Sequence, residues 1–201
     1  MPKFHTRWTV FPHGPVEEID DGLLSVEGEI HMPLGTMRKA GVPSASIRRI
    51  WKQRYPQIKV LCPPGARPRV EQAVSVDATT DILRDESVRF VLVEGTREAE
   101  SALIVRRKAG TSLVLNDIVS NIRHPKGLGA NIMARLFGFG VKRPQMAREV
   151  RWLLVRDKPA LAAQLRGWAD DPNLKRLIVS HGDIISQHPE TVLRSIALTL
   201  D

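Results

Sequence analysis

Short apolar runs separated by polar turns are the main pattern along the middle of this chain. The runs Val88–Val93, Ser101–Arg107 and Thr111–Leu115 are rich in Val, Ile and Leu and are bounded by polar residues. Runs of this length and composition are typical of buried strands. The Lys108-Ala109-Gly110 turn between the last two runs predicts that they form an antiparallel hairpin.

Helical spacing replaces this pattern toward the end of the chain. Asp157 is placed to cap a helix whose inward residues recur at i, i+4 and i+7, namely Leu161, Leu165 and Trp168. The run Leu174–Ser180 predicts a further strand, and Pro189 stands where it favours the first turn of a final helix. Four apolar residues of that helix share one face: Leu193, Ile196, Ala197 and Leu200.

Other segments give weaker patterns. Leu23–Ile30 and Ile58–Cys62 predict strands, and Ser44 is placed to cap a short helix. One helical face is predicted from Met146, Val150, Leu153 and Leu154. Strands that alternate with helices near the end of the chain, together with a hairpin in the middle, predict an α/β fold with a mixed sheet.

Composition places the chain among ordinary globular proteins. It has 201 residues, of which 42% are hydrophobic and 26% are charged, and this length favours a single domain spanning residues 1–201. No apolar run approaches the roughly 20 residues that span a bilayer, and the N-terminus lacks the apolar stretch of a signal peptide, so we expect no membrane partner. The single cysteine, Cys62, excludes an internal disulfide and favours a reducing, cytoplasmic location.

Positive charge is the one unusual feature of the composition. The formal net charge is +8, and arginine is concentrated in two segments, Arg38 to Arg69 and Arg135 to Arg156. Such a field attracts phosphate, nucleic acid or anionic substrates, and the alternative is an ordinary solvated surface. Aromatic residues make up only 5% of the chain, so stacking platforms for nucleic-acid bases are scarce.

Candidate chemistry gathers where two of the apolar runs end. Ser112–Asp117 and Leu177–Asp183 each pass from apolar residues into a small polar cluster. Because sites in α/β sheets form at strand ends, Asp117, His181 and Asp183 are expected around one crevice. Their oxygen and imidazole groups are suited to zinc or another divalent metal ion.

An ordered set of short motifs resembles a family of uncharacterised proteins within the metallo-β-lactamase-fold superfamily. The motifs are Trp51-Lys52-Gln53-Arg54-Tyr55-Pro56, Pro64-Gly65-Ala66, Glu94-Gly95-Thr96, Leu115-Asn116-Asp117 and Ser180-His181-Gly182-Asp183. The resemblance implies an α/β fold in which a sandwich of two mixed β-sheets is flanked by helices, here reduced in the N-terminal half. It also implies a metal centre at one edge of the fold. Relatives hydrolyse thioesters, lactams, lactones and phosphodiesters by means of a metal-bound hydroxide.

Two of these motifs carry the implied metal ligands. Asp117 resembles the metal-binding acid at the end of a strand, and His181 resembles the last metal-binding histidine. Thr96 stands where the superfamily usually has a histidine after glycine. The hallmark His-x-His-x-Asp-His is absent from the sequence. Either the chain is shortened where relatives carry this motif, or the segment from Met32 to Ile47 replaces it in a diverged form.

Each candidate residue also has a structural interpretation. Asp117 is equally suited to a turn after a strand, whereas His181 before a glycine is harder to explain by packing. Asp183 is expected to orient His181 as a catalytic residue. Substrate contacts are expected from Asn116, Asn121 and Arg123. Two further histidines, His31 and His124, are weaker ligand candidates that also fit surface loops.

Three functional hypotheses follow. The first is a metal-dependent hydrolase acting on a small-molecule substrate, with Asp117 and His181 as metal ligands. The second is a degenerate member of the same fold that has lost tight metal binding and acts as a binding or scaffold module. The third is a protein that binds phosphate or nucleic acid, and it depends on charge alone. A shortened sandwich would also leave strand edges exposed, which favours pairing with a second copy of the chain.

Overall fold

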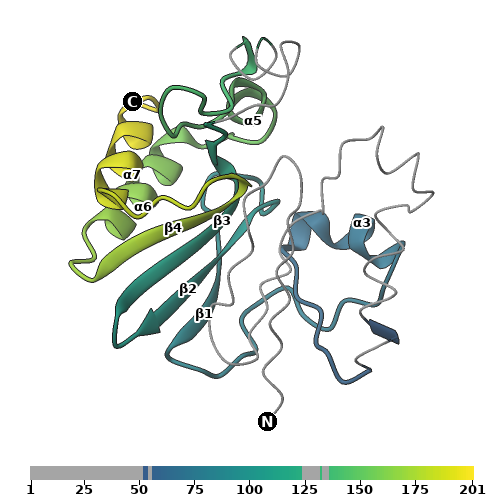
Figure 1. Ribbon diagram of the computed structural model, residues 1–201. Helices are drawn as coiled ribbons and strands as arrows, with labels where there is room; N and C mark the ends of the chain where they lie inside the picture. The colour runs from purple at the N-terminus through teal and green to yellow at the C-terminus, as the bar shows by residue number, and fades with distance from the viewer. Residues whose placement is uncertain (1–51, 54–55, 124–131, 133–135) are drawn as a thin grey trace.

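A four-stranded mixed sheet is the centre of the fold (Figure 1). The computed structural model describes residues 52–53, 56–123, 132 and 136–201. The strands lie side by side in the order of the sequence: β1 (Val88–Leu92), β2 (Ser101–Arg107), β3 (Gly110–Asn121) and β4 (Leu174–Gly182). The pairs β1–β2 and β2–β3 are antiparallel, whereas β3 and β4 are parallel. The predicted hairpin and the mixed α/β sheet are therefore confirmed.

Helices connect and follow the parallel strands. The crossover from β3 to β4 contains α5 (Arg148–Leu153) and α6 (Lys158–Ala169), and α7 (Pro189–Leu198) comes after β4. Figure 1 shows α6 and α7 packed side by side on one face of the sheet. A short 3₁₀ turn, η1 (Pro64–Ala66), leads into α3 (Arg67–Glu71) on the opposite side of the sheet.

Both faces of the sheet are apolar. One face packs against α6 and α7 and forms the main core, in which Leu113, Leu115, Leu161, Leu165, Leu177 and Leu193 are almost completely buried. The other face carries a second cluster of buried residues: Val88, Phe90, Leu103, Val105 and Val114. Because each buried side chain of this size contributes roughly 1.5–3 kcal/mol, both layers stabilise the sheet.

The two long helices begin where the sequence predicts. The side chain of Asp157 accepts a hydrogen bond from the backbone N–H of Ala160 (3.0 Å), so the predicted cap of α6 is confirmed. Trp168 is half-buried against the main core. Pro189 opens α7, and the four predicted inward residues of that helix and its C-terminal flank are buried: Leu193, Ile196, Ala197 and Leu200.

Two predicted elements differ from the structure. Ile58–Cys62 is not a strand, because only Leu61 pairs, in an isolated bridge to Ala78. The helix expected around residue 150 begins at Arg148, and Leu153 is 73% exposed, although it was expected to face inward. The helix is too short to bury a complete apolar stripe against the core.

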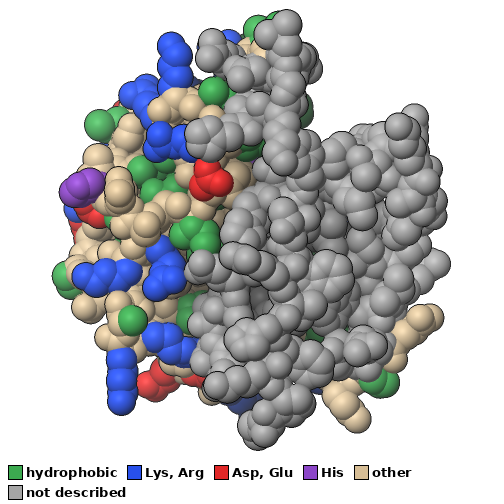
Figure 2. Space-filling model, in the orientation of Figure 1, with side chains coloured by type: hydrophobic (Ala, Val, Ile, Leu, Met, Phe, Trp, Pro, Cys, Tyr) green, Lys and Arg blue, Asp and Glu red, His purple; other side chains and the backbone are tan. Residues whose placement is uncertain are grey.

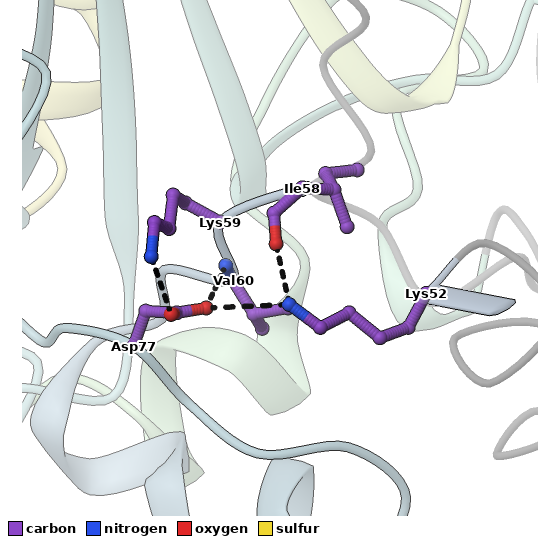
Figure 3. Close-up of polar contacts among 5 residues, drawn as sticks. All are labelled: Lys52, Ile58, Lys59, Val60 and Asp77. Carbon is purple, nitrogen blue, oxygen red and sulfur yellow. Dashed lines mark hydrogen bonds and ion pairs between the residues drawn. The ribbon is translucent and has the colours of Figure 1, made fainter. Parts of the chain in front are cut away.

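An aspartate holds the segment that was expected to be a strand (Figure 3). The Asp77 carboxylate accepts hydrogen bonds from the backbone N–H of Val60 (2.9 Å) and from Lys59 Nζ (3.2 Å). Lys52 Nζ lies 3.9 Å from the same carboxylate and donates to the carbonyl oxygen of Ile58 (2.6 Å). The Val60 bond is the largest influence and holds the pKa of Asp77 below its ordinary value; partial burial opposes it, and both lysines reinforce it.

Several sequence predictions lie outside the described residues. These are the first strand at Leu23–Ile30, the helix capped by Ser44 and the altered segment from Met32 to Ile47. The described residues contain one sheet, and the second sheet implied by the resemblance stays a prediction, as does a single domain over residues 1–201. Across the part of the chain that is described, no helix is long and apolar enough to cross a membrane.

Candidate active site

An irregularity in the pairing of β3 with β4 positions the candidate site. Leu115 pairs with Val179 and Ser120 pairs with His181, so four residues of β3 stand opposite the single residue Ser180 of β4. Extra residues of this kind bend a strand and redirect its side chains, and they are common beside active sites. The burial pattern records the change, because 116 and 117 are both half-buried whereas 118 to 121 are all buried.

The irregular segment brings Asp117 and His181 into direct contact. Asp117 Oδ1 lies 2.6 Å from His181 Nε2, although the two residues are 64 positions apart in the sequence. Their side chains are 33% and 17% exposed, respectively, so both are partly open to solvent. The expectation that these two groups meet at one rim of the sheet agrees with this geometry.

The contact fixes the imidazole. A carboxylate against one ring nitrogen sets the orientation of the ring and the nitrogen that carries the proton. Asp117 occupies the orienting position that the sequence suggested for Asp183. The Asp183 side chain is exposed, and within the described residues it forms no hydrogen bond or ion pair with His181.

Backbone contacts hold the ends of β3 and β4 together. Gly182 has a φ of +115°, and a Cβ atom at this position would lie 2.1 Å from the carbonyl oxygen of Asn121. The backbone N–H of Asp183 donates to that same oxygen (3.0 Å). Only glycine permits both the left-handed conformation and the close approach, so Gly182 fixes the position of His181.

The predicted substrate-binding residues occupy different environments. Asn121 is buried, and its side-chain nitrogen donates to the carbonyl oxygen of Asp183 (2.8 Å). Its side-chain oxygen accepts a hydrogen bond from Arg123 Nε (3.1 Å), and Arg123 is exposed. Asn121 thus joins the two strand ends and Arg123, whereas Arg123 itself is accessible to a ligand. Their roles toward substrate stay predictions.

Glu100 is a neighbour of the site that sequence reasoning missed. It is buried immediately before β2, and its Oε1 accepts a long hydrogen bond from the side chain of Asn116 (3.4 Å). Asn116 directly precedes Asp117. The segment before β2 is rich in charged residues and resembles a surface loop, so no sequence signal distinguishes Glu100 from its exposed neighbours.

Thr96 contributes to a turn. Its side chain is buried, and its Oγ1 donates to the carbonyl oxygen of Val93 (2.6 Å). The preceding Gly95 has a φ of +75°, and its carbonyl accepts hydrogen bonds from the backbone N–H groups of Arg156 and Asp157. Thr96 therefore helps to hold the β1–β2 connection together.

The donor atoms of the pair partly fit a divalent metal ion. Carboxylate oxygen and imidazole nitrogen are ordinary zinc ligands, but two such atoms on a tetrahedral ion lie about 3.3 Å apart, farther than the 2.6 Å found between Asp117 and His181. No group of three or more His, Cys, Asp or Glu side chains suited to a metal ion exists within the described ranges. The pair alone therefore supplies two of the roughly three protein ligands of a catalytic zinc site.

The two other histidine candidates for this site, His31 and His124, lie outside the described residues. Comparison with known proteins does not add to the donor set, because neither a scan against protein-family models nor a search of curated proteins found a match to this chain. The chemistry of the site is therefore inferred from its own residues and geometry.

Proposed function

We propose that this chain is a metal-dependent hydrolase with a metallo-β-lactamase-like architecture, in which Asp117 and His181 hold a divalent ion such as zinc. The observation that carries the proposal is the 2.6 Å approach of Asp117 Oδ1 to His181 Nε2. Those two atoms are the donors with which each side chain binds zinc. They meet at the ends of two neighbouring parallel strands, which is where sites of α/β sheets are built.

The residues of the candidate site have different roles in this proposal. The bound ion would lower the pKa of a water molecule and polarise the scissile bond. Asp117 and His181 would hold the ion, and Gly182 keeps His181 in place. The exposed Arg123, tethered to Asn121, is positioned to hold an anionic part of a substrate. A third ligand comes from outside the described residues, with His31 and His124 as the candidates.

The second apolar face of the sheet supports the proposed architecture. Val88, Phe90 and Leu103 are buried on the face opposite α6 and α7. Leu61 packs against this cluster, so its segment forms part of the layer that covers the face. In a metallo-β-lactamase-like sandwich, a second sheet would complete this layer.

A second candidate is a binding module on the same scaffold that no longer binds metal tightly. The observation in its favour is the same contact, because a direct hydrogen bond already satisfies Asp117 and His181 without an ion. The use of Thr96 to close a turn adds to this interpretation, since the residue in that position serves the fold.

Elemental analysis of protein purified without chelator distinguishes the two candidates. The proposal predicts about one equivalent of metal per chain, because the pair forms one mononuclear site. The His181→Asn and Asp117→Asn variants are expected to lose the metal. His188→Asn is the matched control, because His188 is 85% exposed and pairs only weakly with Glu190 (3.6 Å).

Hydrolysis gives the second measurement. The metal-loaded wild type is screened against thioester, lactone, lactam and phosphodiester substrates, and the activity found is expected to fall roughly 100-fold or more in His181→Asn. His188→Asn is expected to keep both its metal and its activity. A wild type that contains no metal and binds no added zinc would overturn the proposal and support the binding module.

A further inference from the structure

A basic surface pocket lies between α7 and the segment that leads into α5. Three arginines line it, Arg143 before α5 and Arg148 and Arg151 within it. The hydroxyl groups of Ser195 in α7 and of Thr199, directly after α7, lie on the other side. Figure 2 shows several Lys and Arg side chains at the upper left of the described surface, near the C-terminus marked in Figure 1, and others lower on the same side. We call this feature the arginine pocket.

Unlike Arg166 and Arg194, the three pocket arginines have no carboxylate partner among the described residues. Arg166 pairs with Asp201, and Arg194 pairs with Asp170. Within the part of the chain that is described, Arg143, Arg148 and Arg151 make no side-chain ion pair or hydrogen bond.

Three cations that line one hollow without an internal anion repel one another. Like charges at short range destabilise a site unless an anion or solvent screens them. A bound oxyanion would remove this repulsion and would also satisfy the guanidinium N–H donors, whose planar forks match its oxygens.

The hydroxyl groups of Ser195 and Thr199 refine the chemistry of the pocket. Thr199 Oγ1 already donates its proton to the carbonyl oxygen of Ile196 (2.7 Å), so it is left as an acceptor. The Ser195 hydroxyl makes no hydrogen bond to another described residue, so it is a free donor beside the arginines. The three guanidinium groups and one hydroxyl offer more hydrogen-bond donors than the two oxygens of a carboxylate can accept. The four oxygens of a phosphate match this number of donors better.

We propose that the arginine pocket is a binding site for a phosphate group of a small ligand. The proposal is independent of the metal proposal, since within the described part of the chain no pocket residue forms a side-chain hydrogen bond or ion pair with Asp117 or His181. The pocket is nevertheless near them in the sheet: Gln145, which lines it, pairs through its backbone with Ser120, and Ser120 pairs with His181. Two interstrand spacings place Gln145 about 10 Å from His181 between Cα atoms.

Isothermal titration with inorganic phosphate in a Tris chloride buffer of fixed ionic strength tests the proposal. Wild type is expected to bind one phosphate per chain. The Arg148→Ala/Arg151→Ala variant is expected to bind at least about tenfold more weakly, because it removes two charge-assisted contacts. The matched control is Arg106→Ala/Lys108→Ala, which removes two exposed charges from the β2–β3 hairpin and is expected to bind as wild type does.

Further variants and ligands distinguish binding in this pocket from non-specific electrostatic attraction of anions to the basic surface. Ser195→Ala is expected to weaken binding by a smaller factor, and acetate is expected to bind far more weakly than phosphate. Binding must persist in Asp117→Asn, so failure of the metal proposal leaves this one standing. No saturable phosphate binding, or an equal loss in both double variants, would overturn the proposal. The proposal would also be overturned if the protein bound a DNA oligonucleotide more tightly than phosphate and both double variants lost this affinity equally.

Discussion

At the scale of single residues, the geometry of the candidate site depends on glycine positions that no other residue can fill. Gly182 sits directly after His181 with a positive φ and against the backbone of Asn121. A side chain there would have to displace the end of β3, because its nearest neighbours are backbone atoms. Gly167 in α6 is the opposite case, since a Cβ atom there would meet nothing within 4 Å.

We therefore expect Gly182→Ala to lower the free energy of unfolding by about 2 to 4 kcal/mol, from backbone strain and steric overlap. Gly167→Ala is expected to raise it by about 0.5 to 1 kcal/mol, because alanine favours a helix interior. Urea denaturation followed by circular dichroism measures both. Equal effects of the two variants would contradict the close packing of the strand ends.

At the scale of elements, local signals decide which parts of the fold can be predicted. The strands around Val88 and Ser101 and the helices that begin after Asp157 and His188 follow from apolar periodicity, turn residues and caps, which act over a few neighbours. The prediction of a strand at Ile58–Cys62 was wrong, because an apolar run becomes a strand only where a partner strand is available. Here the Asp77 carboxylate accepts the hydrogen bond from the backbone N–H of Val60.

The candidate site was predictable only in part, for a related reason. The polar ends of two apolar runs predict that Asp117 and His181 lie near one another. Their direct contact depends on the four residues of β3 that stand opposite Ser180, and this register shift has no signal in the sequence. The sequence shows the concentration of arginine from Arg135 to Arg156. It does not show the pocket that these arginines form with α7, or the burial of Glu100, because each depends on segments that meet only in the folded chain.

The cap of α6 allows an element-scale prediction. Asp157→Ala removes the hydrogen bond to the backbone N–H of Ala160 and is expected to cost about 1 kcal/mol of stability. Asp170→Ala serves as the control, because it removes only an exposed ion pair with Arg194 and is expected to cost less than about 0.5 kcal/mol. Thermal denaturation of both variants is the measurement, and a larger loss in the control would contradict the assignment of the cap.

At the scale of the whole molecule, a few carboxylates make the free energy of unfolding depend on pH in the acidic range. The pKa of Asp77 is lowered chiefly by the Val60 N–H, and the pKa of Asp85 is lowered chiefly by hydrogen bonds from the Ser87 side chain and backbone. A carboxylate with a lower pKa in the folded state stabilises the fold above its unfolded pKa, whose ordinary value for aspartate is 3.8. This contribution is lost as the pH falls through the folded pKa.

The unfolding free energy is therefore expected to fall as the pH is lowered from 5 to 3, and Asp77→Asn is expected to show a shallower fall. Urea titrations at several pH values measure the slopes. Added sodium chloride at about 0.5 M is expected to weaken only the lysine contributions, since the Val60 hydrogen bond is short-ranged. The same slope in wild type and variant would show that Asp77 does not contribute.

The parallel pairing of β3 with β4 has a consequence for how the molecule could respond to a ligand. Asp117 belongs to a strand that is already paired with β2, whereas His181 belongs to the outer strand, which reaches the sheet only after a long helical crossover. Any molecule that binds both side chains links β4 to β3. Because α7 packs against β4, this link also stabilises α7. Ligand binding would then stabilise β4 more than the rest of the sheet. It should slow amide hydrogen exchange in β4 more than in the β1–β2 hairpin.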